Sequence, residues 1–142
     1  MAVLACCLLT ADAARPVKLE KGVFVRILFA DGRPQVRRAL RLFLEQQPEF
    51  EIVGEVEAGA ALPGAVEEQA PDVILLDWEL PGLDPQQLSQ ALGPSPITWI
   101  ALSSRPESEA AALAAGADAF ISKSEPTERF LEMVFGAIRR ER

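Results

Sequence analysis

The chain has 142 residues, of which 49% are hydrophobic and 25% charged, a composition typical of one soluble globular domain. Its formal net charge of -7 argues against a nucleic-acid-binding surface, because phosphate backbones are bound by clustered Lys and Arg side chains. The sequence has no histidine, which excludes histidine-based metal sites and Ser-His-Asp triads.

Residues 1–22 are predicted to form a flexible leader that precedes a single domain over residues 23–142. The stretch from Met1 to Leu9 is apolar but too short to span a bilayer, and it lacks the basic start of a secretory signal. Cys6 and Cys7 are adjacent, and no second pair completes a zinc site or a disulfide framework. We expect a cytoplasmic protein without membrane association; an export signal and a start codon assigned too early are the alternatives for the leader.

From Val23 onward, short apolar runs alternate with longer segments that have helical spacing. This alternation is typical of βαβ units and a parallel sheet, and the second strand is polar enough to suit an edge. The predicted elements, in chain order, are strand Val25–Ala30, helix Pro34–Gln46, strand Glu51–Val56, helix Leu62–Gln69, strand Val73–Asp77, helix Pro85–Leu92, strand Thr98–Leu102, helix Glu107–Ala115, strand Ala119–Ile121 and helix Thr127–Arg140.

Polar residues stand at the carboxyl ends of four of these strands, where parallel sheets bind their ligands. They are Asp31, Asp77, Ser103 and Lys123. Each alone is more simply explained as a helix cap, a turn former or a solvated side chain. Together, two carboxylates, a hydroxyl and an ammonium are the groups that metal-assisted phosphoryl transfer requires.

The stretches that surround these residues resemble a known family, the receiver domains of bacterial response regulators. The resemblance covers about residues 25–139 and fits the LuxR-type, NarL-like subgroup, whose full-length members often carry a C-terminal DNA-binding domain. It rests on Ile27-Leu28-Phe29-Ala30-Asp31, Asp72-Val73-Ile74-Leu75-Leu76-Asp77, Leu80-Pro81-Gly82-Leu83-Asp84, Ala101-Leu102-Ser103-Ser104 and Ala115-Gly116-Ala117-Asp118-Ala119-Phe120-Ile121-Ser122-Lys123.

The resemblance implies a doubly wound α/β fold with a five-stranded parallel sheet in the flavodoxin-like order 2-1-3-4-5 and helices on both faces. It also implies roles for the site residues. Asp77 would be the nucleophile that accepts a phosphoryl group, and Mg²⁺ would be held by Asp31, an Asp77 oxygen and the backbone carbonyl of Glu79. Ser103 would hydrogen-bond the phosphoryl oxygens, and Lys123 would neutralise their charge.

The sequence departs from the family pattern directly after the first strand. The family normally has two consecutive acids there, whereas this chain has Asp31-Gly32-Arg33. One metal ligand is therefore missing, so we expect Mg²⁺ to bind weakly and Gly32→Asp to improve binding and phosphorylation. Arg33 either points to solvent or brings a competing positive charge, and the Glu79 side chain either stays exposed or replaces the missing ligand.

Two functions compete on this sequence, and neither is an enzyme. The first is a single-domain response regulator that is phosphorylated by a sensor histidine kinase or a phosphotransfer protein and signals through protein contacts, with a homodimer as one option. The second is a pseudo-receiver, a phosphorylation-independent interaction module, which Gly32 favours. A phosphatase of the haloacid dehalogenase type is a third reading, which Asp77-Trp78-Glu79 disfavours because that family has a second Asp two residues after its nucleophile.

Overall fold

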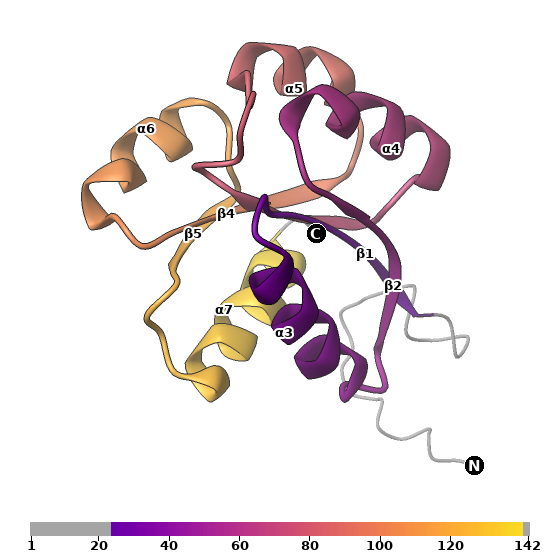
Figure 1. Ribbon diagram of the computed structural model, residues 1–142, viewed down its shortest axis with the longest axis vertical. Helices are drawn as coiled ribbons and strands as arrows, with labels where there is room; N and C mark the ends of the chain where they lie inside the picture. Colours follow the sequence, from indigo (N-terminus) through magenta and orange to yellow (C-terminus); the bar gives the residue numbers. More distant parts are fainter. Residues whose placement is uncertain (1–23, 141–142) are drawn as a thin grey trace.

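The computed structural model describes residues 24–140, which form one parallel sheet covered by helices on both faces (Figure 1). Within these residues the sheet has five strands in the order β2-β1-β3-β4-β5, which confirms the predicted fold class and strand order. The polar second strand lies at an edge, as expected. The predicted leader over residues 1–22 lies outside the described residues. The strands are β1 (Val25–Ala30), β2 (Phe50–Val56), β3 (Val73–Asp77), β4 (Thr98–Ser103) and β5 (Ala119–Ser122).

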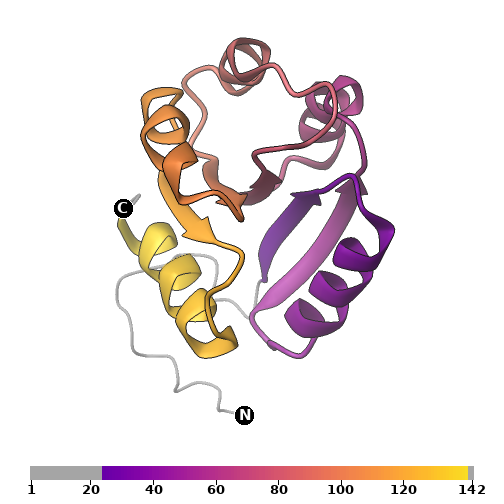
Figure 2. The same ribbon diagram turned by 60° about the vertical axis from the view of Figure 1, so that its left-hand side comes forward.

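The helices divide between the two faces of the sheet (Figures 1 and 2). Helices α3 (Pro34–Glu45) and α7 (Thr127–Arg140) cover one face, and α4 (Leu62–Gln69), α5 (Pro85–Leu92) and α6 (Glu109–Ala114) cover the other. Two 3₁₀ turns, η2 (Gly59–Ala61) and η3 (Pro106–Ser108), precede α4 and α6. Proline in the first turn of α3 and α5 suits a helix start, because the N–H that proline lacks has no partner there.

Each face of the sheet has its own hydrophobic core, because successive side chains of a strand point to opposite faces. On β3, Ile74 and Leu76 pack with the helices α4, α5 and α6, whereas Val73 and Leu75 pack with α3 and α7. All residues of β3 are buried, as expected for the central strand of a sheet covered on both sides. Because the two cores hold the strands in place, they also determine where each strand ends and where the residues after it lie.

Some predicted boundaries were wrong, most clearly the helix Glu107–Ala115. The segment begins instead with the turn η3, in which the Ser108 N–H bonds to the Arg105 carbonyl at 3.0 Å, a tighter turn than that of an α-helix. The strands β2, β4 and β5 are each one residue longer than predicted, because strand pairing continues at their ends. Phe50 lies opposite Val25, and Ser103 lies opposite Ser122. Gln46 caps α3 and is not part of the helix.

Candidate phosphoryl-transfer site

The four polar residues predicted at strand ends come together at the carboxyl edge of the sheet. Asp31 follows β1, Asp77 ends β3, Ser103 ends β4 and Lys123 follows β5. Asp31, Asp77 and Ser103 are almost completely buried, with exposed fractions of 1%, 4% and 0%. The Lys123 Nζ lies 3.0 Å from Asp31 Oδ2 and 3.0 Å from Asp77 Oδ1, so one ammonium group serves both carboxylates. Charges buried this deeply require such pairing.

The two oxygens of Asp77 have different surroundings. Oδ1 contacts Lys123 and also accepts a hydrogen bond of 3.1 Å from the Glu79 N–H. Oδ2 has no hydrogen bond with any residue in the range 24–140. The carboxylate is thus held through one oxygen, and the lone pairs of the other are available for a reaction or for a cation.

Ser103 and Glu79 are bonded to each other. The Ser103 hydroxyl donates to Glu79 Oε2 at 2.8 Å and accepts from the Arg105 N–H at 2.9 Å. The Glu79 carboxylate therefore lies next to the predicted phosphoryl-binding hydroxyl. For Ser103 to donate to a phosphoryl oxygen, as the sequence predicts, its hydroxyl must give up the hydrogen bond to Glu79.

Asp31 is covered on both of its carboxylate oxygens. Oδ2 contacts Lys123, and Oδ1 accepts a hydrogen bond from the Arg33 N–H at 2.9 Å and lies 3.5 Å from Arg33 Nε. The Arg33 side chain is 59% exposed, so it reaches the site from the solvent side. Of the two orientations that the sequence left open for Arg33, the structure has the one that brings positive charge to the pocket.

Two contacts that support the site were not predicted. The Arg37 guanidinium donates to the carbonyl of Asp31 at 2.7 Å, and the Gly59 N–H donates to the carbonyl of Pro81 at 2.7 Å. A Cβ atom on Gly59 would overlap the carbonyl group of Gly82, so only glycine fits. The helical pattern alone predicts only that Arg37 lies on the polar side of its helix. Its place near the start of that helix, close to the end of the preceding strand, is the feature of the sequence that could have indicated the contact with Asp31.

The donor atoms fit Mg²⁺ in kind and are few in number. Asp31 and Asp77 supply the hard carboxylate oxygens that Mg²⁺ prefers, and this ion commonly keeps several waters when few protein ligands are present. The described part of the chain brings no group of three or more acidic, histidine or cysteine side chains together for a metal. Two carboxylates attract a divalent cation less strongly than three, and the weak binding expected from Gly32 stays a prediction.

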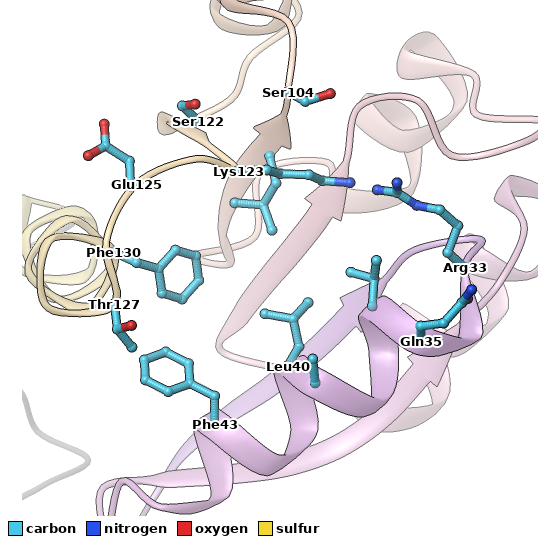
Figure 3. Close-up of a pocket in the computed structure, with 13 residues that line it drawn as sticks. Arg33, Gln35, Leu40, Phe43, Ser104, Ser122, Lys123, Glu125, Thr127 and Phe130 are labelled. Atoms are coloured by element: carbon cyan, nitrogen blue, oxygen red, sulfur yellow. The ribbon is translucent and has the colours of Figure 1, made fainter.

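A cavity of about 650 Å³ lies beside the site, between α3 and the segment that leads from β5 into α7 (Figure 3). Its wall is mostly apolar, with Leu40, Phe43 and Phe130 among the lining residues. At one end, the side chains of Arg33 and Lys123 extend toward each other. The site is therefore open on the α3 side, where both cations can be reached.

Comparisons with known proteins agree with this geometry. The profile of the response regulator receiver domain matches residues 27–135, and the chain belongs to this family. It is 36% identical over 109 residues to the transcriptional regulatory protein YhcZ of Bacillus subtilis, a match that covers 73% of this chain and 51% of YhcZ. It is also 34% identical over 76 residues to the transcriptional regulatory protein BtsR of Escherichia coli, a match that covers 54% of this chain and 32% of BtsR.

Solved structures give the same result. The receiver domain of the response regulator NarL from Mycobacterium tuberculosis superposes with a TM-score of 0.72 at 27% identity, over 82% of this chain and 97% of that domain. The response regulator domain of CheB from Thermotoga maritima superposes with a TM-score of 0.68 at 25% identity, over 83% of this chain and 96% of that domain.

These matches define the chain as a receiver domain of two-component signalling, related to the NarL-like regulators. Receiver domains are signalling domains, generally not enzymes, and they generally bind Mg²⁺ at the phosphorylation site and interact with histidine kinases or phosphotransfer proteins. The chain spans about half the length of YhcZ, or 51%. No helix among residues 24–140 is long and apolar enough to cross a membrane.

Proposed function

We propose that this protein is a phosphoacceptor in which Asp77 receives the phosphoryl group. The observation that carries the proposal is the asymmetry of the Asp77 carboxylate. Lys123 and the Glu79 N–H hold Oδ1, while Oδ2 accepts no hydrogen bond from the described residues. A buried carboxylate with one anchored and one available oxygen is suited to nucleophilic attack, because its geometry is set before the substrate arrives.

The reaction transfers a phosphoryl group from the phosphohistidine of a sensor kinase or a phosphotransfer protein. Asp77 Oδ2 forms a bond to phosphorus, the P–N bond breaks, and the imidazole nitrogen keeps the electron pair and takes up a proton. The product at Asp77 is an acyl phosphate. Lys123 already lies between the two carboxylates and neutralises part of the added charge.

Ser103 carries the signal away from the phosphoryl group in this proposal. It exchanges its bond to Glu79 for one to a phosphoryl oxygen, so that the end of β4 reports the state of Asp77. Mg²⁺ would be held weakly by Asp31 and Asp77, with Glu79 as the third predicted ligand, and when bound it neutralises phosphoryl charge.

The domain must also pass its signal to a partner. We infer a cytoplasmic regulator that signals through protein contacts and that can form a homodimer. The net charge of -7 supports a protein partner and not nucleic acid.

A pseudo-receiver is the second candidate, and one observation favours it. Both oxygens of Asp31 are already bonded to the protein, and Gly32 supplies no further acid. Such a site does not need a metal to balance its charge. The domain would then act as an interaction module in its unphosphorylated form.

Intact mass after incubation with acetyl phosphate and Mg²⁺ separates the two candidates. The wild type should gain the mass of one phosphoryl group, and Asp77→Asn should not, since the amide keeps the shape but is not a nucleophile. Asp84→Asn is the matched control: Asp84 caps α5 through its side chain, and Asn caps helices equally well. No gain in the wild type would favour the pseudo-receiver, and a gain in Asp77→Asn would place the acceptor elsewhere.

A further inference from the structure

The residue that follows the missing metal ligand brings a cation to the site. Arg33 precedes α3, and its backbone N–H and Nε both approach Asp31 Oδ1, at 2.9 Å and 3.5 Å. Lys123 contacts the other oxygen of the same carboxylate at 3.0 Å. Figure 3 shows the two cationic ends extending toward each other at one end of the cavity. One buried carboxylate thus lies between two positive groups.

The formal charges of Asp31 and Asp77 are matched by two cations without a metal, and the Glu79 carboxylate beside Ser103 is a further negative charge at the site. Asp31 and Asp77 contribute two negative charges, and Lys123 and Arg33 contribute two positive charges within 3.5 Å of them. A divalent cation that binds Asp31 is repelled by both of these groups and competes with them for the carboxylate. Arg33 is the easier one to displace, because its side chain is 59% exposed whereas that of Lys123 is 17% exposed.

We propose that Arg33 is the second cation of the phosphoryl site: it competes with Mg²⁺ for Asp31 and takes over part of the charge neutralisation that the metal supplies in other receivers. This inference rests on the proposed function of Asp77. It makes phosphorylation of this chain less dependent on Mg²⁺ than the family pattern implies. A guanidinium suits the task, since its planar N–H groups bind carboxylate and phosphoryl oxygens with two parallel hydrogen bonds.

The first test measures Mg²⁺ affinity without a phosphodonor, by titrating MgCl₂ against tryptophan fluorescence. Trp78 directly follows Asp77 and stacks on Trp99 at a centroid distance of 6.4 Å, so it reports events at the acceptor. Arg33→Ala should bind Mg²⁺ about threefold to tenfold more tightly, because the competing charge is close but partly screened by water. Arg38→Ala is the matched control: Arg38 is exposed on α3, the helix that Arg33 precedes, and no ion pair joins it to a described residue.

The second test compares phosphorylation by acetyl phosphate in Mg²⁺ and in EDTA. The transfer forms the bond from Asp77 to phosphorus, and acetate leaves with the electron pair. Removal of the metal should slow Arg33→Ala at least about tenfold more than it slows the wild type, since loss of one donor to a developing charge typically costs about 10²-fold. Arg33→Lys, which keeps the charge, should lie between the two.

The outcomes separate this inference from the proposed function. If Arg33→Ala and Arg38→Ala bind Mg²⁺ equally and respond equally to EDTA, the role of Arg33 is wrong while Asp77 can still be the acceptor. If the wild type is not phosphorylated under either condition, the proposed function fails, and the Mg²⁺ titration alone decides whether Arg33 competes for Asp31. Unchanged Mg²⁺ affinity in Arg33→Ala overturns the inference in that case too.

Discussion

Lys123 is the residue on which the charge balance of the site depends most. It is shared by two carboxylates that are nearly completely buried, so Lys123→Met leaves both with reduced compensation. We expect the free energy of unfolding at pH 7 to fall by roughly 1–3 kcal/mol, less than the 3–5 kcal/mol typical of a fully buried pair, because Lys123 is 17% exposed. Saturating Mg²⁺ should restore part of the loss; thermal melts with and without the ion measure both effects.

A double variant serves as the control for this prediction. Asp31→Asn removes one of the negative charges that Lys123 balances, so Lys123→Met combined with Asp31→Asn should be more stable than the sum of the two single losses predicts. Additive losses would mean that the charge of Lys123 does not stabilise the fold through Asp31.

Gly32→Asp is more demanding than the sequence alone suggests. A Cβ atom at Gly32 would lie 2.8 Å from Cδ and 3.1 Å from Cγ of Pro81, and a proline ring has little freedom to move. The added carboxylate should tighten Mg²⁺ binding, as expected from the missing acid, but at a cost in thermal stability without the metal. The melting temperature in EDTA measures that cost, and Gly32→Ala shows how much of it is steric.

Removing the contact between position 32 and the Pro81 ring tests whether this contact limits Mg²⁺ binding. Gly32→Asp combined with Pro81→Ala removes the ring atoms that the new side chain meets, and should bind Mg²⁺ more tightly than Gly32→Asp alone. If both variants bind Mg²⁺ no better than the wild type, Arg33 or an unfavourable carboxylate direction, and not Pro81, limits the site.

The sequence could predict which residues meet at the site, but not how their side chains pair. Parallel strands end at one edge, so Asp31, Asp77 and Lys123 had to lie close together once the strands were recognised. The partners of Glu79 and Arg33 depend on the side-chain torsions of long residues beside loops, which no periodic pattern encodes. For that reason the bond between Glu79 and Ser103 is visible only in the structure.

Among the elements, the start of α3 is tied to the site by Arg37. Its guanidinium bonds to the Asp31 carbonyl at 2.7 Å and lies 3.3 Å from Glu55 on β2, and its side chain is only 15% exposed. Arg37→Ala should lower the free energy of unfolding by about 1–2 kcal/mol, because a buried carbonyl loses a charged donor. Arg38→Ala, an exposed change on the same helix, should stay within about 0.5 kcal/mol. Urea denaturation compares them, and equal losses would contradict the assigned role.

The ends of elements were harder to predict than their centres. Apolar runs located the three central strands β1, β3 and β4, because these strands are buried on both faces of the sheet. The break between η3 and α6 was missed, since an Ala-rich segment reads as continuous helix until the tight bond from Ser108 to Arg105 is seen. Boundaries are set by such local hydrogen bonds, which composition does not reveal.

At the scale of the whole molecule, two cores share one sheet and should therefore unfold together. Leu75→Ala and Leu76→Ala remove side chains from opposite faces, and each should cost about 2–5 kcal/mol. Trp99 lies only in the core that contains Leu76. If the domain is cooperative, tryptophan fluorescence and far-UV circular dichroism give the same urea midpoint in both variants. Separate midpoints in Leu75→Ala would show that the two faces unfold independently.

The contact between Gly59 and the loop after β3 has a consequence for how this sequence can vary. In a library that randomises single positions and selects folded chains, Gly59 should be recovered almost always as glycine, because any side chain there would overlap the Gly82 backbone. Gly64 lies in α4, and a methyl group added to it would meet no atom within 4 Å, so its replacement by alanine should gain up to about 1 kcal/mol. Position 59 therefore accepts only glycine during evolution, whereas position 64 is free to change, although the sequence alone does not distinguish the two.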